Sequence, residues 1–206
     1  VDLRELAKSR HVFSTEQSIS IAIKILDALF EAHKYGVIHR DIKPANIFID
    51  TEGHAHVLDF GIAHFLGKED GQILHSGEDQ TQPGTIMGTL AYMSPEQQQS
   101  AHLVTPLSDL YSLGVVMYVL FTGQKPKADL LEPSKLSSEI PARLNQLILD
   151  CLQHKPEKRP DSADIIKDQL LTLLQGTHLE DTQIARADVG SESIKERFSL
   201  LDVIKE

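Results

Sequence analysis

The stretch VIHRDIKPANIFID, residues 37–50, decides how the rest of the chain is interpreted. Within it, Asp41 offers a carboxylate, Lys43 a cation and Asn46 a neutral oxygen ligand. Asp59 follows in the run DFG and offers the hard anionic oxygen that Mg²⁺ prefers. Moving a phosphoryl group onto a hydroxyl needs such groups, because this reaction depends on positioning and charge neutralisation. The stretch therefore predicts a phosphoryl-transfer site.

Composition narrows the classes of protein that remain. The chain has 206 residues, of which 41% are hydrophobic and 24% are charged, as in ordinary globular domains. Its net charge of −10 argues against a nucleic-acid partner. The longest apolar run, residues 113–121, is about half of the roughly 18 residues that a membrane helix needs, so we expect no membrane segment. The single cysteine excludes an internal disulfide and predicts a cytoplasmic location.

Helical patterns precede the opening stretch. Residues 2–8 predict a short helix. Ser14, with Gln17 three residues later, predicts the N-cap and capping box of a second helix. Apolar residues then recur at helical spacing until Gly36, which predicts the end of a long amphipathic helix with one buried face.

From residue 37 the pattern changes to short β-rich runs. These runs are VIH, NIFID and AHVLDF, and residues 51–53 predict a hairpin turn between the last two. Residues 62–93 show little periodicity and predict a long loop. A loop of that length inside a compact domain is usually functional or disordered.

Helices dominate the second half of the chain. Residues 108–121 predict a largely buried helix whose start is marked by Ser108 and Asp109. Residues 141–154 and 161–174 predict two further amphipathic helices. Together with the small β patch, they predict an α+β fold class that is mostly α-helical.

The last segment has a different composition. Residues 175–206 are interpreted as a polar linker followed by an amphipathic tail. Ser193 and Glu196 form a capping-box pattern that predicts a helix in this tail. The alternative is a strand that begins another module.

Five motifs in order resemble one family. They are HRDIKPANIF, DFG, GTLAYMSPE, SDLYSLGVVMYVLFTGQKP and HKPEKRP. Residues 1–174 resemble the large, C-terminal lobe of the eukaryotic-type (Hanks-type) protein kinases, a family that the transfer chemistry also fits. HRDIKPANIF, residues 39–48, resembles the catalytic loop of this family, and Lys43 matches the serine/threonine form of that loop. YMSPEQ is similar to the bacterial branch.

The resemblance implies a role for each residue of the opening motifs. Asp41 is the expected catalytic base, and Lys43 is expected to contact the transferring phosphate and the substrate hydroxyl. Asn46 and Asp59 are the expected Mg²⁺ ligands, so the implied cofactors are ATP and Mg²⁺. Phe48 resembles the floor of the adenine pocket.

Other residues are implied in nucleotide binding and regulation. Asp2 resembles the acidic residue near the ribose of ATP. Arg40 is expected to pair with a phosphorylated residue of the 62–93 loop, because a guanidinium binds phosphate bidentately. Ser76, Thr81 and Thr85 are candidates, with Thr85 preferred, and the alternative is a constitutive anion from Glu78 or Asp79. Thr89 is expected to contact the catalytic aspartate and lysine.

The remaining implied roles are architectural. Glu96 is expected to pair with Arg159, and Asp109 is expected to accept backbone amide bonds from the catalytic loop. His39 is interpreted as a packed, hydrogen-bonding core histidine, because Asp41 already fills the role of the base.

The family's small, N-terminal lobe has no counterpart in the sequence. That lobe supplies a glycine-rich loop, a strand lysine and a helix glutamate, and the twelve glycines of the chain contain no G-x-G pair. We therefore expect a fragment of a longer serine/threonine kinase that acts on protein substrates and is inactive as an isolated chain. The alternative is a non-catalytic, pseudokinase-like interaction module.

Overall fold

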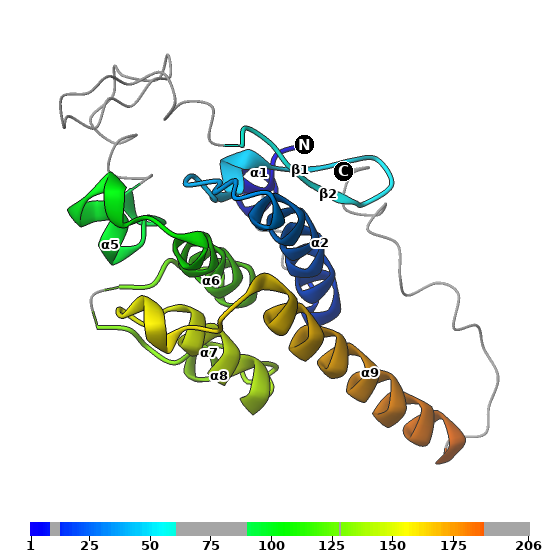
Figure 1. The fold of residues 1–206 in the computed structure, drawn as a ribbon. Coiled ribbons are helices and arrows are strands. Elements are labelled where there is room, and N and C mark those ends of the chain that lie inside the picture. The colour runs from blue at the N-terminus through cyan, green and yellow to red at the C-terminus, as the bar shows by residue number, and fades with distance from the viewer. Residues whose placement is uncertain (9–12, 61–89, 128, 188–206) are drawn as a thin grey trace.

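The computed structural model describes residues 1–8, 13–60, 90–127 and 129–187. Helices and one small hairpin make up this part of the chain, as Figure 1 shows, so the predicted α-rich α+β character is confirmed. The elements are α1 (Leu3–Lys8), α2 (Thr15–Lys34), η1 (Pro44–Asn46), β1 (Ile47–Ile49), β2 (Ala55–Val57), α5 (Pro95–Gln99), η2 (Ala101–Leu103), α6 (Pro106–Thr122), α7 (Pro133–Leu136), α8 (Ala142–Cys151), η3 (Pro156–Lys158) and α9 (Ala163–Ala187).

Helix α2 begins and ends as its sequence predicts. The Ser14 hydroxyl accepts the Gln17 amide, and the Gln17 side chain accepts the Ser14 amide, which completes the capping box. Gly36 follows the helix with φ of +71°, a left-handed conformation that glycine adopts without steric cost. One face of the helix is buried against α6 and α9.

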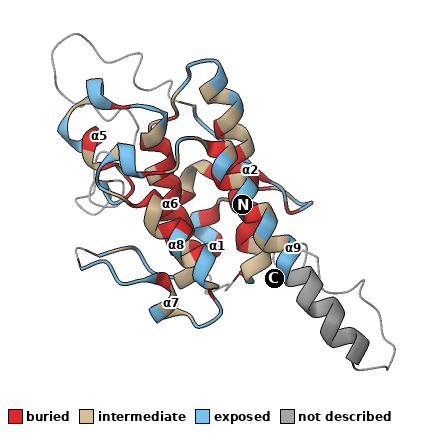
Figure 2. Ribbon diagram, turned by 60° about the horizontal axis from the view of Figure 1, so that its bottom comes forward, coloured by how far each residue is buried: buried red, intermediate tan, exposed pale blue. Residues whose placement is uncertain are grey.

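Helix α6 forms the centre of the core. Figure 2 shows most of its residues as buried, and Leu110, Leu113 and Met117 are inaccessible to solvent. Gly114 lets α8 approach closely, because a Cβ atom there would lie 2.7 Å from the Cβ of Cys151. A helix that is apolar on all sides must be enclosed by neighbouring elements.

The predicted start of α6 at Ser108 and Asp109 is wrong. The helix begins earlier, with Thr105 as N-cap, Pro106 at the first helical position and Ser108 closing the capping box. Proline suits that position because its missing N–H would have no helical partner there. Asp109 lies inside the first turn, which leaves its carboxylate available to another segment.

The sheet is a two-stranded antiparallel hairpin, with Phe48 opposite His56. Its turn is the predicted one: the Asp50 carboxylate accepts the amides of Glu52 and His54 at 2.9 and 2.8 Å, and Gly53 has φ of +82°. The predicted run VIH, residues 37–39, forms no strand. The His39 amide is instead bound by the carboxylate of Asp109.

The C-terminal helix is longer than predicted. Helix α9 continues past residue 174 to Ala187, through the first part of the predicted linker, and packs along α2. The predicted tail, residues 193–206, lies outside the described residues. Within the described ranges, none of the helices combines the length and apolarity required to cross a bilayer.

Candidate active site

The three polar residues of the opening stretch lie together in the structure. The Lys43 ammonium is 2.8 Å from Asp41 Oδ2, and Asn46 Nδ2 donates to the same oxygen at 2.9 Å. Asn46 Nδ2 also donates to the Asp41 carbonyl oxygen at 2.8 Å, which closes the loop on itself. The Asp41 side chain remains 42% exposed, so a hydroxyl from outside can reach it. A carboxylate within hydrogen-bond reach of its substrate is the geometry that a general base requires.

Arg40, immediately before Asp41, has a left-handed backbone with φ of +68°. Its amide donates to Asp109 Oδ1 at 2.8 Å, and the adjacent His39 amide donates to Asp109 Oδ2 at 2.8 Å. The expected contact between Asp109 and the catalytic loop is therefore present. His33 of α2 adds a third contact, since its Nε2 lies 2.8 Å from Asp109 Oδ2.

His39 joins the catalytic loop to the segment before Asp59. The side chain is fully buried, and its Nδ1 accepts the Asp41 amide at 3.2 Å. Because Nδ1 acts as acceptor, Nε2 carries the proton and donates to the Leu58 carbonyl oxygen at 2.9 Å. The ring also packs against Phe60, with centroids 4.8 Å apart. These contacts match the packed, hydrogen-bonding role expected for this histidine.

The two predicted metal-binding residues lie on backbone segments that are bonded to each other. The Leu58 amide donates to the Asn46 carbonyl oxygen at 2.8 Å, which places the following residue, Asp59, beside the end of the catalytic loop. Asp59 is exposed and has φ of +59°.

Among the residues that the structure describes, left-handed backbone at non-glycine residues is confined to this site. In the part of the chain that the structure describes, Arg40 and Asp59 are the two non-glycine residues with positive φ. Such a conformation costs on the order of 1–3 kcal/mol at each residue and persists only where the surroundings impose it. The strain therefore lies at Arg40, which precedes the polar cluster of Asp41, Lys43 and Asn46, and at Asp59, the second predicted metal ligand.

The donor set fits Mg²⁺. Asn46 uses its nitrogen to bind Asp41, which leaves its Oδ1 as a possible ligand atom. Among the described residues, no group of three or more His, Cys, Asp or Glu side chains is arranged to hold a metal. Mg²⁺ does not need one, because it keeps several waters and commonly binds one or two protein oxygens together with substrate phosphates.

The residues predicted to contact the nucleotide lie side by side. Asp2 forms an antiparallel bridge with Phe48, and the Ile49 amide donates to the Val1 carbonyl oxygen at 2.8 Å. Phe48 is 38% exposed on the outward face of the hairpin. The Asp2 carboxylate also has a local structural role, because Oδ1 accepts the Glu5 amide at 2.8 Å at the start of α1.

The expected ion pair between Glu96 and Arg159 is present and bidentate. Two nitrogens of the guanidinium donate to the two carboxylate oxygens at 2.7 and 2.8 Å, and Ser108 donates to Glu96 Oε1 at 2.7 Å. Burial opposes ionisation of Glu96, but the bonds from Arg159 and Ser108 hold its pKa at about 2. Arg159 also donates to the Leu107 carbonyl oxygen and packs on the ring of Tyr111. The pair ties α5 to the helical base.

Two long-range contacts that support the catalytic loop from outside it were not predicted. The His33 contact to Asp109 and a bond from Gln97 Nε2 to the Arg40 carbonyl oxygen both join residues far apart in sequence. No motif or periodicity in the sequence indicates either pair. Four residues of the 62–93 loop with predicted roles lie outside the described residues, and their roles stay predictions: Ser76, Thr81, Thr85 and Thr89.

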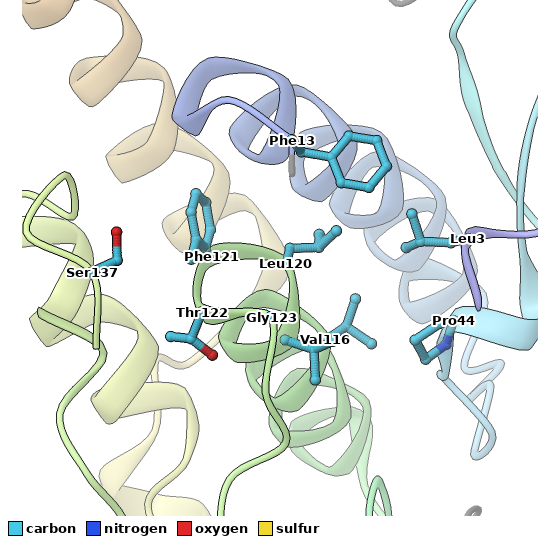
Figure 3. Close-up of a pocket in the computed structure, with 10 residues that line it drawn as sticks. Leu3, Phe13, Pro44, Val116, Leu120, Phe121, Thr122, Gly123 and Ser137 are labelled. Atoms are coloured by element: carbon cyan, nitrogen blue, oxygen red, sulfur yellow. The ribbon is translucent and has the colours of Figure 1, made fainter. Parts of the chain in front are cut away.

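An apolar cavity of about 220 Å³ lies beside the catalytic loop, between α1 and the C-terminal end of α6. Figure 3 shows Leu3, Pro44, Val116 and Leu120 around it, with Phe13 at its edge. None of the predicted catalytic or metal-binding residues lines this cavity. It is therefore separate from the polar cluster, although Pro44 directly follows Lys43.

Comparison with known proteins identifies the family. A family model described as the protein kinase domain matches residues 1–171. The chain is 35% identical to a probable serine/threonine-protein kinase of Streptomyces coelicolor, over 84% of the chain and 27% of that protein. It is 31% identical to the serine/threonine-protein kinase PknB of Mycolicibacterium smegmatis, over 85% of the chain and 29% of that protein.

A third relative gives the same result. The chain is 33% identical to a probable serine/threonine-protein kinase of Clostridium acetobutylicum, over 93% of the chain and 30% of that protein. The chain belongs to the protein kinase domain family, and these three relatives are named as serine/threonine kinases, or probable ones, of bacteria. It spans less than a third of the length of these relatives.

Proposed function

We propose that residues 1–174 are the C-terminal lobe of a serine/threonine protein kinase that transfers the γ-phosphoryl group of ATP to protein hydroxyls. The observation that carries this proposal is the cluster of Asp41, Lys43 and Asn46, joined at 2.8 and 2.9 Å beside the segment that carries Asp59. Family membership supports the same chemistry. The cytoplasm is the proposed location.

Asp41 acts as the base in this proposal. Its carboxylate accepts the proton of the substrate hydroxyl, while Asn46 donates to Oδ2 and keeps the group oriented. Lys43 lies 2.8 Å from the same oxygen, where its ammonium can reach a neighbouring phosphate oxygen. The chain thereby supplies positioning and charge, which this reaction needs more than covalent participation.

Asn46 Oδ1 and the Asp59 carboxylate would hold Mg²⁺, and Phe48 and Asp2 would contact the adenine and the ribose. When bound, Mg²⁺-ATP supplies the phosphoryl group and neutralises part of its charge. The left-handed backbone of Asp59 turns the chain at the predicted metal ligand. The exposed face of Phe48 leaves that ring available to a planar partner.

We also propose that a small lobe precedes Val1 in a longer protein, and we call this chain joined to that lobe the completed domain. Positioning of the β- and γ-phosphates supplies much of the rate in this reaction, and the family places that task in the small lobe. The isolated chain is therefore expected to be nearly inactive. The division at residue 174, with a linker and tail beyond it, remains part of the proposal.

The test is to assay the completed domain and the isolated 206-residue chain on a serine- and threonine-containing protein substrate with Mg²⁺-ATP. We expect phosphate transfer by the completed domain and almost none by residues 1–206. Robust transfer by residues 1–206 alone would contradict the need for the small lobe. A completed domain that binds partners but transfers no phosphate would instead favour a pseudokinase-like interaction module.

Regulation through Arg40 belongs to the same proposal. No hydrogen bond or ion pair joins the Arg40 guanidinium to another described residue, so the group is available to an anion. A phosphate on Thr85 would carry about −1.5 to −2 charges and three acceptor oxygens. Phosphatase treatment of active completed domain, with mass spectrometry to confirm a phosphate-free loop, is expected to lower its activity. Unchanged activity would favour Glu78 or Asp79 as a constitutive anion.

A further inference from the structure

Gln97 makes a contact for which the proposed catalytic roles give no reason. Its side chain is 6% exposed, and its Nε2 donates to the Arg40 carbonyl oxygen at 2.6 Å. Gln97 belongs to α5, whereas Arg40 lies in the catalytic loop, 57 residues earlier in the sequence. A buried amide that gives its hydrogen bond to one backbone carbonyl constrains the orientation of that peptide group.

The two peptide groups on either side of the Arg40 Cα atom are both held by side chains. Asp109 Oδ1 binds the Arg40 N–H at 2.8 Å, which orients the first peptide group. In the second, Gln97 binds the Arg40 carbonyl oxygen and His39 Nδ1 accepts the Asp41 N–H at 3.2 Å. Rotation about the Arg40 backbone bonds would break at least one of these contacts. The left-handed conformation at φ of +68° is therefore imposed from outside the loop.

The second peptide group leads directly into Asp41. Its orientation decides where the Asp41 side chain begins, and hence whether Oδ2 meets Lys43 and Asn46. Gln97 is anchored in turn, because the adjacent Glu96 is bound to Arg159 and Ser108. The Gln97 amide thus joins the buried pair of Glu96 and Arg159 to the peptide group that precedes Asp41.

We propose that Gln97 is a positioning residue for the catalytic base, which it orients by binding the carbonyl oxygen of Arg40. This inference rests on the proposed kinase function for its catalytic consequence. Its structural consequence, the imposed conformation of Arg40, does not depend on that function. Loss of the donor is expected to release Arg40 toward ordinary backbone angles and to move the Asp41 carboxylate.

Two substitutions separate the donor from the volume of the side chain. Gln97→Leu removes the donor at similar size, and Gln97→Glu keeps the shape but replaces the donating amide with a carboxylate. Gln99→Leu and Gln99→Glu are the matched controls, because Gln99 is exposed on the same helix. In the 206-residue chain, backbone ¹³C chemical shifts of Arg40 and Asp41 report the conformation directly. Both Gln97 variants are expected to change them, and both Gln99 variants to leave them unchanged.

In the completed domain, both Gln97 variants are expected to lower kcat by about 10- to 100-fold, as small misplacements of catalytic groups do. The KM values for ATP and for the protein substrate are expected to change by less than about twofold, because binding surfaces are retained. Unchanged Arg40 shifts, or a kcat within about twofold of the parent for Gln97→Leu, would overturn the proposal. If the unsubstituted completed domain transfers no phosphate, the proposed function fails, while the chemical shifts still decide whether Gln97 holds Arg40.

Discussion

Two carboxylates of this chain, Asp41 and Glu96, each meet a cation at under 3 Å, yet their surroundings differ completely. The Glu96 side chain is 9% exposed, and Arg159 and Ser108 bind both of its oxygens. Asp41 has a side chain that is 42% exposed, and its hydrogen bonds converge on Oδ2.

This difference in burial and bonding suits the Glu96–Arg159 pair to a structural role and the Asp41–Lys43 pair to a chemical role. Removing one partner of a buried, fully bonded pair leaves an uncompensated charge away from water, so Glu96 contributes to stability. An exposed pair such as Asp41 with Lys43 contributes little to stability, because water screens it. Among the described residues, no hydrogen bond or ion pair involves Asp41 Oδ1, so this oxygen is available to a hydroxyl, whereas both oxygens of Glu96 are bonded. We expect substitutions at the two sites to have opposite phenotypes.

The largest effect is expected for Asp41→Asn in the completed domain. The change removes the basicity of the carboxylate at nearly constant volume, so turnover is expected to fall by about 10²- to 10⁴-fold with an unchanged melting temperature. A radiometric kinase assay and a thermal melt measure the two quantities. Asp150→Asn is the matched control and is expected to keep parental turnover, because Asp150 lies on α8 and its carboxylate accepts a solvent-exposed bond from Gln146. Near-parental turnover of Asp41→Asn would show that the Asp41 carboxylate does not act as the base.

The opposite phenotype is expected for Glu96→Ala. Arg159 would stay buried without its anionic partner, and the free energy of unfolding is expected to fall by roughly 3–5 kcal/mol. Urea denaturation of the 206-residue chain measures this loss. Glu132→Ala, in the exposed pair with Lys135, is the control and is expected to cost about 0–1 kcal/mol. Equal losses in the two variants would show that burial does not distinguish the pairs.

Acid is expected to weaken the Glu96–Arg159 pair over a defined range of pH. The pKa of Glu96 is about 2 in the folded chain, below its ordinary value of 4.5, so ionised Glu96 stabilises the fold fully above pH 4.5. This stabilisation, roughly 3 kcal/mol from the difference in pKa, is lost progressively as the pH falls from 4.5 toward 2. Denaturation curves of the parent and of Glu96→Gln between pH 7 and 3 test whether this stabilisation falls with pH. The stability gap between them should narrow in acid, and a constant gap would contradict the assignment.

The smallest effect is expected for Asp59→Ala, which tests a second exposed carboxylate of the candidate site. Loss of an oxygen ligand is expected to weaken Mg²⁺-dependent nucleotide binding by the completed domain at least about tenfold. Stability is expected to fall by no more than about 1 kcal/mol, because the side chain is exposed but alanine tolerates the left-handed backbone of residue 59 less well than aspartate. Calorimetric titration with ATP and a thermal melt test both parts, with the exposed Asp161→Ala as control. A melting temperature that falls as far as for Glu96→Ala would give Asp59 a structural role instead.

Local signals predicted the elements that depend on a few neighbouring residues. The capping box of Ser14 and Gln17, the stop at Gly36 and the turn before Gly53 all form as expected, because their hydrogen bonds join residues close in sequence. The helix after Thr105 was placed too late, since Ser108 and Asp109 resemble helix starts equally well. The VIH run suits a strand by composition, yet its backbone is bound by a distant carboxylate.

The sequence by itself determined the kinase-like motifs, the mostly helical class and the identities of the reactive groups, because these follow from residue types and short spacings. Only the tertiary structure decided which carboxylate is buried and which stays exposed, and which side chains hold the catalytic loop. The contacts of Arg40 with Asp109 and Gln97 span 69 and 57 residues. Such pairs form only when helices α5 and α6 pack beside the loop, and burial then strengthens each hydrogen bond while making its loss costly.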